Sequence, residues 1–330
     1  MSDGEVEAAF LKHFQKPPQE LYSHWDPVPF AGGAIGQVHK ATLKSGEIVS
    51  VKVKYPGIAK TIKNDFSAIK KIAPLVNIFF SNIDLLAQVR QWESRTLIET
   101  DYRVEESNLS EFGSSMPKEI CEIPKTYPEY CGPSILTSEF VDGQRLEDFI
   151  IDSDQDKCDE IGRDLFLSTY QMILDKKFRL DIHMGNYLVR ENKLVMIDFG
   201  VIGDLNKTKT NHLTVMDLVI AGDSAGLKSY LEAANWTKDL PIAIAEKFVK
   251  IFGEPFSGEV FKFDQQYVSK LLDFLMKDLG NYARMPDDSI YVLRIVGSMY
   301  NLLAQLECKG NWREISAPFH SSSKTLLKTS

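Results

Sequence analysis

The chain has 330 residues, enough for one large or two medium hydrophobic cores, so its length predicts two lobes. Its composition, 44% hydrophobic and 25% charged, is ordinary for a globular protein. A net charge of −8 at pH 7 argues against a general nucleic-acid binder, because affinity for a phosphate backbone requires a basic surface.

The first part of the chain is predicted to be rich in strands. In chain order we expect a helix over 4–15, strands over 37–43 and 47–54, helices over 58–73 and 84–112, and a buried strand over 134–141. The short segment Lys44-Ser45-Gly46 suits a hairpin connection. Alternation along 47–54 puts Lys52 on the face opposite the valines, which suits either a nucleotide cleft or a solvent face.

The second part is predicted to be mainly helical. Two short strands, 187–190 and 194–197, interrupt helix-type patterns over 156–177, 209–221, 224–235, 240–252, 264–280 and 287–308. The change of character predicts an α+β fold with an N-terminal lobe over 1–140 and a helical C-terminal lobe over 141–330.

A cluster of polar residues around the two short strands carries the main chemical signal. Asp181 and Asn186 stand five residues apart, and Asp198 follows the second strand in an Asp-Phe-Gly. Phosphoryl transfer uses one carboxylate to orient the acceptor hydroxyl, and an Asn and a second Asp to hold Mg²⁺ on the phosphates of ATP. We therefore predict Asp181 as the catalytic carboxylate, with Asn186 and Asp198 as metal ligands.

The strand lysine and a helix glutamate form a second predicted pair. Ile98, Tyr102, Glu105 and Leu109 follow helical spacing, so Glu105 lies in a stripe that otherwise faces the core. A buried carboxylate is costly unless it is paired, and Lys52 is the expected partner. The alternative is that Glu105 edges the stripe and reaches water.

Two further segments are candidates for ATP contacts. Small residues just before the strand over 37–43 let backbone approach a phosphate closely, and they are Ala31, Gly32, Gly33, Ala34 and Gly36. The backbone of Glu139 and Val141, at the end of the buried strand, is expected to hydrogen-bond the adenine edge.

Five motifs, in this order, resemble the UbiB family of atypical protein-kinase-like proteins. They are Ile35-Gly-Gln-Val-His, Val51-Lys-Val-Lys-Tyr-Pro-Gly, Glu99-Thr-Asp101-Tyr-Arg-Val-Glu105, Asp181-x-His-x-Gly-Asn186 and Asp198-Phe-Gly. The resemblance implies a two-lobed kinase-like fold, binding of ATP with Mg²⁺, a role in isoprenoid-quinone biosynthesis and membrane association. It also implies that the loop before Gly36 covers ATP, and that Glu99 and Asp101 form the family's regulatory Glu-x-Asp pair.

Of three departures from the family pattern, two bear on the openness of the site, and the third, at the residues around Asp181, leaves the charged residues intact. The family's Lys-x-Gly-Gln motif, which folds over the active site, is absent from the residues before the loop. Gly32 and Gly33 stand where the family usually has alanines. Both departures favour a more open, more kinase-like site.

Three functions are compatible with these residues. The leading hypothesis is a kinase or ATPase acting on a lipid, small-molecule or protein acceptor. A nucleotide-gated scaffold with little phosphotransfer would use the same binding residues. An aminoglycoside-type small-molecule kinase shares the order of Asp, Asn and Asp, but the Glu-x-Asp pair favours the UbiB group.

The sequence also bears on location. There is no run of about 18 apolar residues, so no membrane span is expected. The acidic start resembles neither a secretory signal nor an Arg-rich transit peptide, and the four cysteines show no metal-site or disulfide spacing. We expect a cytoplasmic protein. Peripheral membrane contact through the apolar segment with Phe79 and Phe80 is the alternative to a solvated helix followed by core.

Overall fold

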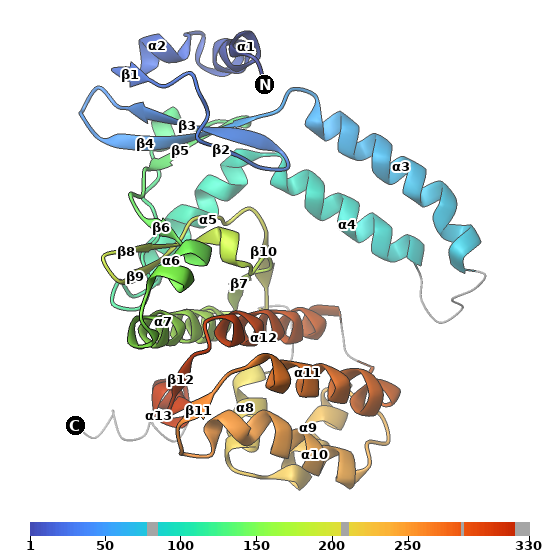
Figure 1. The fold of residues 1–330 in the computed structure, drawn as a ribbon. Coiled ribbons are helices and arrows are strands. Elements are labelled where there is room, and N and C mark those ends of the chain that lie inside the picture. Colours follow the sequence, from blue (N-terminus) through green and yellow to red (C-terminus); the bar gives the residue numbers. More distant parts are fainter. Residues whose placement is uncertain (78–84, 206–210, 285–286, 321–330) are drawn as a thin grey trace. The chain divides into compact units, whose positions relative to one another are not determined.

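The computed structural model describes residues 1–77, 85–205, 211–284 and 287–320, and these residues divide into two compact units (Figure 1). Unit 1 comprises Met1–Ser115, Ile123–Asp142 and Ile197–Val201, and unit 2 comprises Met116–Glu122, Gly143–Met196 and Ile202–Ser330. A sheet forms the centre of unit 1 and helices dominate unit 2, which confirms the α+β fold class. The division into functional domains at residue 140 stays a prediction. The segment 116–122, which interrupts unit 1 in the sequence, belongs to unit 2. The segment 197–201, which interrupts unit 2, belongs to unit 1.

Unit 1 is built on one antiparallel sheet with the order β1-β3-β4-β5, and β2 pairs with the start of β3 on the edge that β1 pairs with at the end of β3. The strands are β1 (His24–Trp25), β2 (Ala31–Gly32), β3 (Gly36–Thr42), β4 (Ile48–Lys54) and β5 (Ile135–Glu139). The β-branched valines of β4 are fully buried and pack with Val6 and Phe10 of the N-terminal helix. Lys52 therefore points from the opposite face of β4.

The helices of unit 1 are α1 (Asp3–Phe14), α2 (Pro18–Leu21), α3 (Ile58–Asn77), α4 (Leu85–Glu99) and α5 (Tyr102–Ser115). Helices α3 and α4 pack side by side (Figure 1), and the ion pair Lys70–Glu93 links them at 2.7 Å. The membrane hypothesis for Phe79 and Phe80 falls on residues outside the described ranges.

The prediction of one helix over 84–112 is wrong, because the chain breaks between α4 and α5. The Asp101 carboxylate accepts the backbone N–H of Arg103 at 3.1 Å, and this side-chain capping starts a new helix. As a result Ile98 lies 50% exposed instead of in the core stripe, whereas Tyr102 and Glu105 are buried as the stripe predicts.

Unit 2 contains two long helices, α7 and α12, which pack against each other (Figure 1). Its helices are α6 (Leu146–Asp152), α7 (Gln155–Leu174), α8 (His212–Ile220), α9 (Ser224–Ala233), α10 (Ile242–Gly253), α11 (Gln265–Asp273), α12 (Asp287–Gln305) and α13 (Trp312–Ser316). The predicted helix over 264–280 ends its α-helical part at Asp273 and continues as a π-helical turn, Phe274–Asp278.

The strands of unit 2 are short. They are β6 (Gln144–Arg145), β7 (Lys177–Arg179), β8 (Tyr187–Arg190), β9 (Lys193–Met196), β10 (Ile202–Asp204), β11 (Phe261–Lys262) and β12 (Lys309–Gly310). β6, β8 and β9 form one antiparallel sheet, and β7 pairs with β10. Within the described part of the chain, no helix has the length and apolar character that crossing a bilayer requires.

Candidate active site

The structure brings Lys52 of β4 and Glu105 of α5 together. The Lys52 Nζ lies 2.5 Å from the Glu105 carboxylate, and the Glu105 side chain is only 6% exposed. The contact follows from two local patterns: alternation turns Lys52 away from the valine core, and the helical period turns Glu105 inward. The alternative in which Glu105 reaches water is wrong.

Asp198 joins the same group in unit 1. Its Oδ2 lies 3.4 Å from the Lys52 Nζ, and its Oδ1 accepts the backbone N–H of Gly200 at 3.1 Å. The intervening Phe199 is buried against Phe112, with ring centroids 5.1 Å apart, so the tripeptide is anchored on α5 by an apolar contact.

Asn108 contacts the Asp-Phe-Gly segment, and sequence reasoning missed it. Its Nδ2 donates to the Phe199 carbonyl at 2.8 Å. It stands one helical turn after Glu105, so both side chains lie on the face of α5 that meets the Asp-Phe-Gly segment. That spacing is the signal that could have found it.

The charges of this group are set by burial and by one another. Burial by itself lowers the pKa of Lys52, but the carboxylates of Glu105 and Asp198 outweigh burial and raise the pKa, so Lys52 is a cation at neutral pH. Burial raises the pKa of Glu105, and the charge of Lys52 opposes that rise. Lys52, held by Glu105, therefore presents a positive charge beside the partly exposed carboxylate of Asp198.

The small-residue loop is a tight hairpin in which only one glycine is sterically required. The Gly33 N–H donates to the Gly36 carbonyl at 2.8 Å. The strand before this turn, β2, pairs with the strand after it, β3. A Cβ at Gly36 would lie 2.5 Å from the Val53 carbonyl oxygen, so Gly36 lets the two strands approach. A Cβ at Gly32 would meet only the Tyr55 hydroxyl, at 3.8 Å, so an alanine would fit there.

The predicted adenine contacts lie at the end of β5. The Glu139 N–H already donates to the Lys125 carbonyl at 2.8 Å. The backbone atom of Glu139 that could bind an adenine is therefore its carbonyl oxygen. The roles of Glu139 and Val141 stay predictions.

The Glu-x-Asp pair straddles the break between α4 and α5. Glu99 ends α4, while Asp101 is bound by the guanidinium of Arg103 at 2.6 and 3.0 Å. Hydrogen bonds from Arg103 hold the pKa of Asp101 below its usual range. The regulatory role of both residues stays a prediction.

Asp181 and Asn186 lie together in unit 2, in the loop between β7 and β8. The Asn186 Nδ2 donates to the Asp181 carbonyl at 3.1 Å, and the His183 Nε2 lies 3.2 Å from the Asp181 carboxylate. Leu180 and Ile182 are buried on either side, so alternation turns the Asp181 side chain outward, where it is 58% exposed. A carboxylate presented in this way can orient a hydroxyl group.

The donor atoms suit Mg²⁺ and ATP. Carboxylate and amide oxygens are ligands of Mg²⁺, which commonly takes one or two protein ligands together with nucleotide phosphates. Asp198 supplies a carboxylate, and because the Asn186 Nδ2 is bound to Asp181, its amide oxygen is the atom left for a metal. In the described ranges, no three His, Cys, Asp or Glu side chains form a metal-binding cluster.

Comparison with known proteins finds relatives among atypical kinases. The chain is 31% identical over 209 residues to protein ACTIVITY OF BC1 COMPLEX KINASE 3, chloroplastic, of Arabidopsis thaliana, covering 61% of this chain and 29% of that protein. It is 27% identical over 317 residues to atypical kinase coq-8, mitochondrial, of Caenorhabditis elegans, covering 90% and 42%. The first three curated relatives are matched over 42% to 57% of their length, so the chain spans about half of them.

A solved structure shares the fold. It is that of Rv3197 of Mycobacterium tuberculosis in complex with erythromycin, and it matches with a TM-score of 0.83 at 21% identity, covering 97% of this chain and 83% of that one. Together with the α+β architecture, the relatives and this match confirm the predicted kinase-like fold.

The family model described as "ABC1 atypical kinase-like domain" matches residues 1–231. That range contains all five motifs on which the UbiB resemblance rests, and it confirms the resemblance. The chain therefore belongs to the ABC1 family of atypical kinase-like proteins.

Proposed function

We propose that this chain binds ATP with Mg²⁺ and acts as an atypical kinase or ATPase of the UbiB type. The observation that carries the proposal is the group of Lys52, Glu105 and Asp198 in unit 1. A buried carboxylate holds a lysine as a cation, 3.4 Å from a second, partly exposed carboxylate. An ammonium for phosphates and a carboxylate for a metal are the parts that phosphoryl transfer requires.

Each residue has a separate role in this proposal. Mg²⁺, when bound, would neutralise charge on the phosphates. Lys52 binds the α- and β-phosphates, Glu105 orients Lys52, Asp198 and Asn186 hold the metal, and Asp181 orients the nucleophile. The loop containing Gly32, Gly33 and Gly36 covers the phosphates with its backbone.

The acceptor is proposed by class only: a lipid, a small molecule or a protein. We extend the proposal to isoprenoid-quinone biosynthesis because the UbiB resemblance implies it and because relatives carry the names coq-8 and COQ8B. A cytoplasmic location with peripheral membrane contact remains part of the proposal.

Calorimetric titration with ATP in the presence of Mg²⁺ tests the binding site. Asp198→Asn keeps the size of the side chain but removes its charge, so we expect nucleotide affinity to fall by about 100-fold or more. Asp65→Asn, the same change at an exposed position of α3, is the matched control and should bind as the wild type does. Equal affinity of Asp198→Asn and wild type would refute the metal assignment.

Phosphate release by the same proteins separates chemistry from binding. Asp181→Asn should retain nucleotide affinity within a few-fold and lose turnover by about 100-fold or more. Loss of binding would make Asp181 a ligand instead. If wild-type protein binds Mg·ATP but releases no phosphate with lipid, quinone-precursor analogue or protein acceptors, the nucleotide-gated scaffold is the better account.

A further inference from the structure

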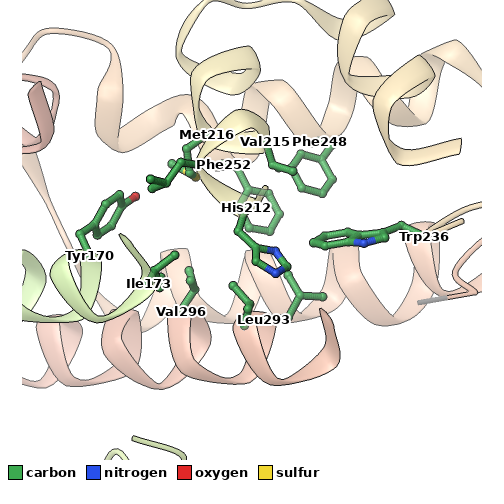
Figure 2. Close-up of a pocket in the computed structure, with 12 residues that line it drawn as sticks. Tyr170, Ile173, His212, Val215, Met216, Trp236, Phe248, Phe252, Leu293 and Val296 are labelled. Carbon is green, nitrogen blue, oxygen red and sulfur yellow. The ribbon is translucent and has the colours of Figure 1, made fainter. Parts of the chain in front are cut away.

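Unit 2 contains an apolar cavity far along the chain from the phosphate-binding motifs. It lies among α7, α8, α10, α12 and Trp236 (Figure 2), has a volume of about 50 Å³ and is partly open. Its walls are almost wholly aliphatic and aromatic. Among the lining side chains, only those of Tyr170, His212 and Trp236 contain a nitrogen or oxygen atom.

His212 is the unusual member of this lining. It is the first residue of α8 and only 7% exposed, and neither ring nitrogen has a hydrogen-bond partner among the residues the structure describes. Figure 2 shows its imidazole among the apolar side chains, with Trp236 beside it, and the two ring centroids are 5.2 Å apart. Buried polar groups are usually hydrogen-bonded, so we expect this side chain to have a partner other than the described residues.

The imidazole is neutral in this setting. Burial lowers the pKa of His212 to about 4, and none of the residues that line the cavity is charged at neutral pH. A neutral imidazole offers one N–H donor and one nitrogen acceptor. A hydroxyl can accept a hydrogen bond from the N–H or donate one to the other nitrogen, so it can pair with a ring nitrogen of His212 in either tautomer.

Water alone satisfies this site poorly. One buried water requires about 10–15 Å³ and two to four polar partners, so the cavity has room for more than one molecule but few partners to offer them. The apolar walls would instead gain from contact with hydrocarbon. The available space fits a slender chain of a few carbons, with any longer part extending through the mouth.

We propose that this cavity binds an aliphatic alcohol, or the hydroxyl-bearing end of a longer aliphatic chain, with its hydroxyl group on His212. The apolar lining, formed by side chains such as Ile173, Phe252 and Leu293, holds the carbon chain. The site is independent of the nucleotide chemistry proposed above, because no residue of that proposal lines it.

The test uses the whole chain, labelled with ¹⁵N in its histidine rings, and two probes of nearly equal shape. 1-Hexanol carries the hydroxyl, and 1-fluorohexane replaces it with a group that cannot donate. We expect 1-hexanol to shift the ring resonances of a single histidine saturably, with at least about 10-fold tighter binding than 1-fluorohexane, since a lost hydrogen bond to a buried group is costly. These resonances should be missing in His212→Phe.

Two controls make the outcome decisive. His24→Phe changes an exposed histidine and should leave 1-hexanol binding unchanged. Val296→Phe fills the cavity from α12, keeps His212, and should abolish binding of both probes. The proposal is overturned by the absence of saturable binding, by equal affinity for the two probes, or by binding to Val296→Phe at wild-type strength, and the last result does not depend on whether a His212 variant folds.

Discussion

The Lys52–Glu105 pair in unit 1 and His212 in unit 2 have opposite surroundings. The charged Lys52 and Glu105 meet at 2.5 Å, and Asp198 lies 3.4 Å from Lys52. In unit 2 His212 is buried among hydrocarbon with neither ring nitrogen hydrogen-bonded to a described residue.

The difference follows from charge. An isolated ion cannot be buried at tolerable cost, so the buried carboxylate of Glu105 requires a cation, and Lys52 supplies one. An imidazole escapes this requirement because it can lose its proton, at the expense of a lowered pKa. The Lys52 cation therefore suits the phosphate proposed for it, whereas the neutral imidazole suits the mostly apolar ligand proposed for the cavity.

The largest effect should come from breaking the pair in unit 1. Glu105→Leu leaves Lys52 with Asp198 alone, at 3.4 Å, and we expect the free energy of unfolding to fall by about 3 kcal/mol. Replacing both partners, in Lys52→Met/Glu105→Leu, should cost less than that single change, because no buried charge is then left unpaired. Urea denaturation of the two single variants and the double variant measures the coupling.

An exposed pair provides the control for that cycle. Asp273 and Lys277 lie 2.9 Å apart, but both side chains are mostly exposed, so Asp273→Leu and Lys277→Met should couple by less than about 1 kcal/mol. If the coupling free energy of Lys52 and Glu105 is no larger than this, burial does not strengthen their interaction. The contrast drawn between the Lys52–Glu105 pair and His212 would then be refuted.

The pH dependence of stability probes His212 directly. Its pKa is about 4 in the folded chain and about 6.5 when unfolded, so between these values the unfolded chain binds more protons. Stability should therefore be greatest above pH 6.5 and decline as the pH falls towards 4. The contribution of this residue amounts to about 3 kcal/mol.

His212→Phe isolates that contribution. The variant should lose less stability than the wild type between pH 7 and pH 4, and it should be at least as stable at pH 7, because an apolar ring suits the cavity. Thermal unfolding at a series of pH values measures both. A wild type and a variant with parallel pH profiles would mean that the imidazole is hydrated or protonated in the folded state.

The sequence predicted the Lys52, Glu105 and Asp198 group but not the cavity around His212, because only the first is encoded in short motifs. Lys52, Glu105 and Asp198 occur in short motifs, and strand alternation and helix period together indicated that Lys52 and Glu105 would meet. The cavity has no such signal, because its walls come from four helices and Trp236, spread over residues 170–296. His212 in the sequence is one histidine at the start of a helix.

Errors within unit 1 have equally specific causes. The helical spacing of apolar residues continues on both sides of Thr100 and Asp101, so it predicted one helix. The Asp101 side chain instead caps the Arg103 N–H, and a second helix begins there. Asn108 was missed because an amide in a helix gives no pattern by itself. Its partner, the Phe199 carbonyl, is distant in sequence.

The smallest expected effect concerns this missed residue. Asn108→Ala removes the hydrogen bond to the Phe199 carbonyl and should lower the free energy of unfolding by about 1 kcal/mol. Ser107→Ala, at the adjacent exposed position of α5, should change stability by less than about 0.5 kcal/mol. Because Phe199 follows Asp198, the Asn108 variant should also bind Mg·ATP a few-fold more weakly, whereas Ser107→Ala should not. A loss of stability with unchanged nucleotide affinity would show that Asn108 supports the fold of unit 1 without positioning Asp198.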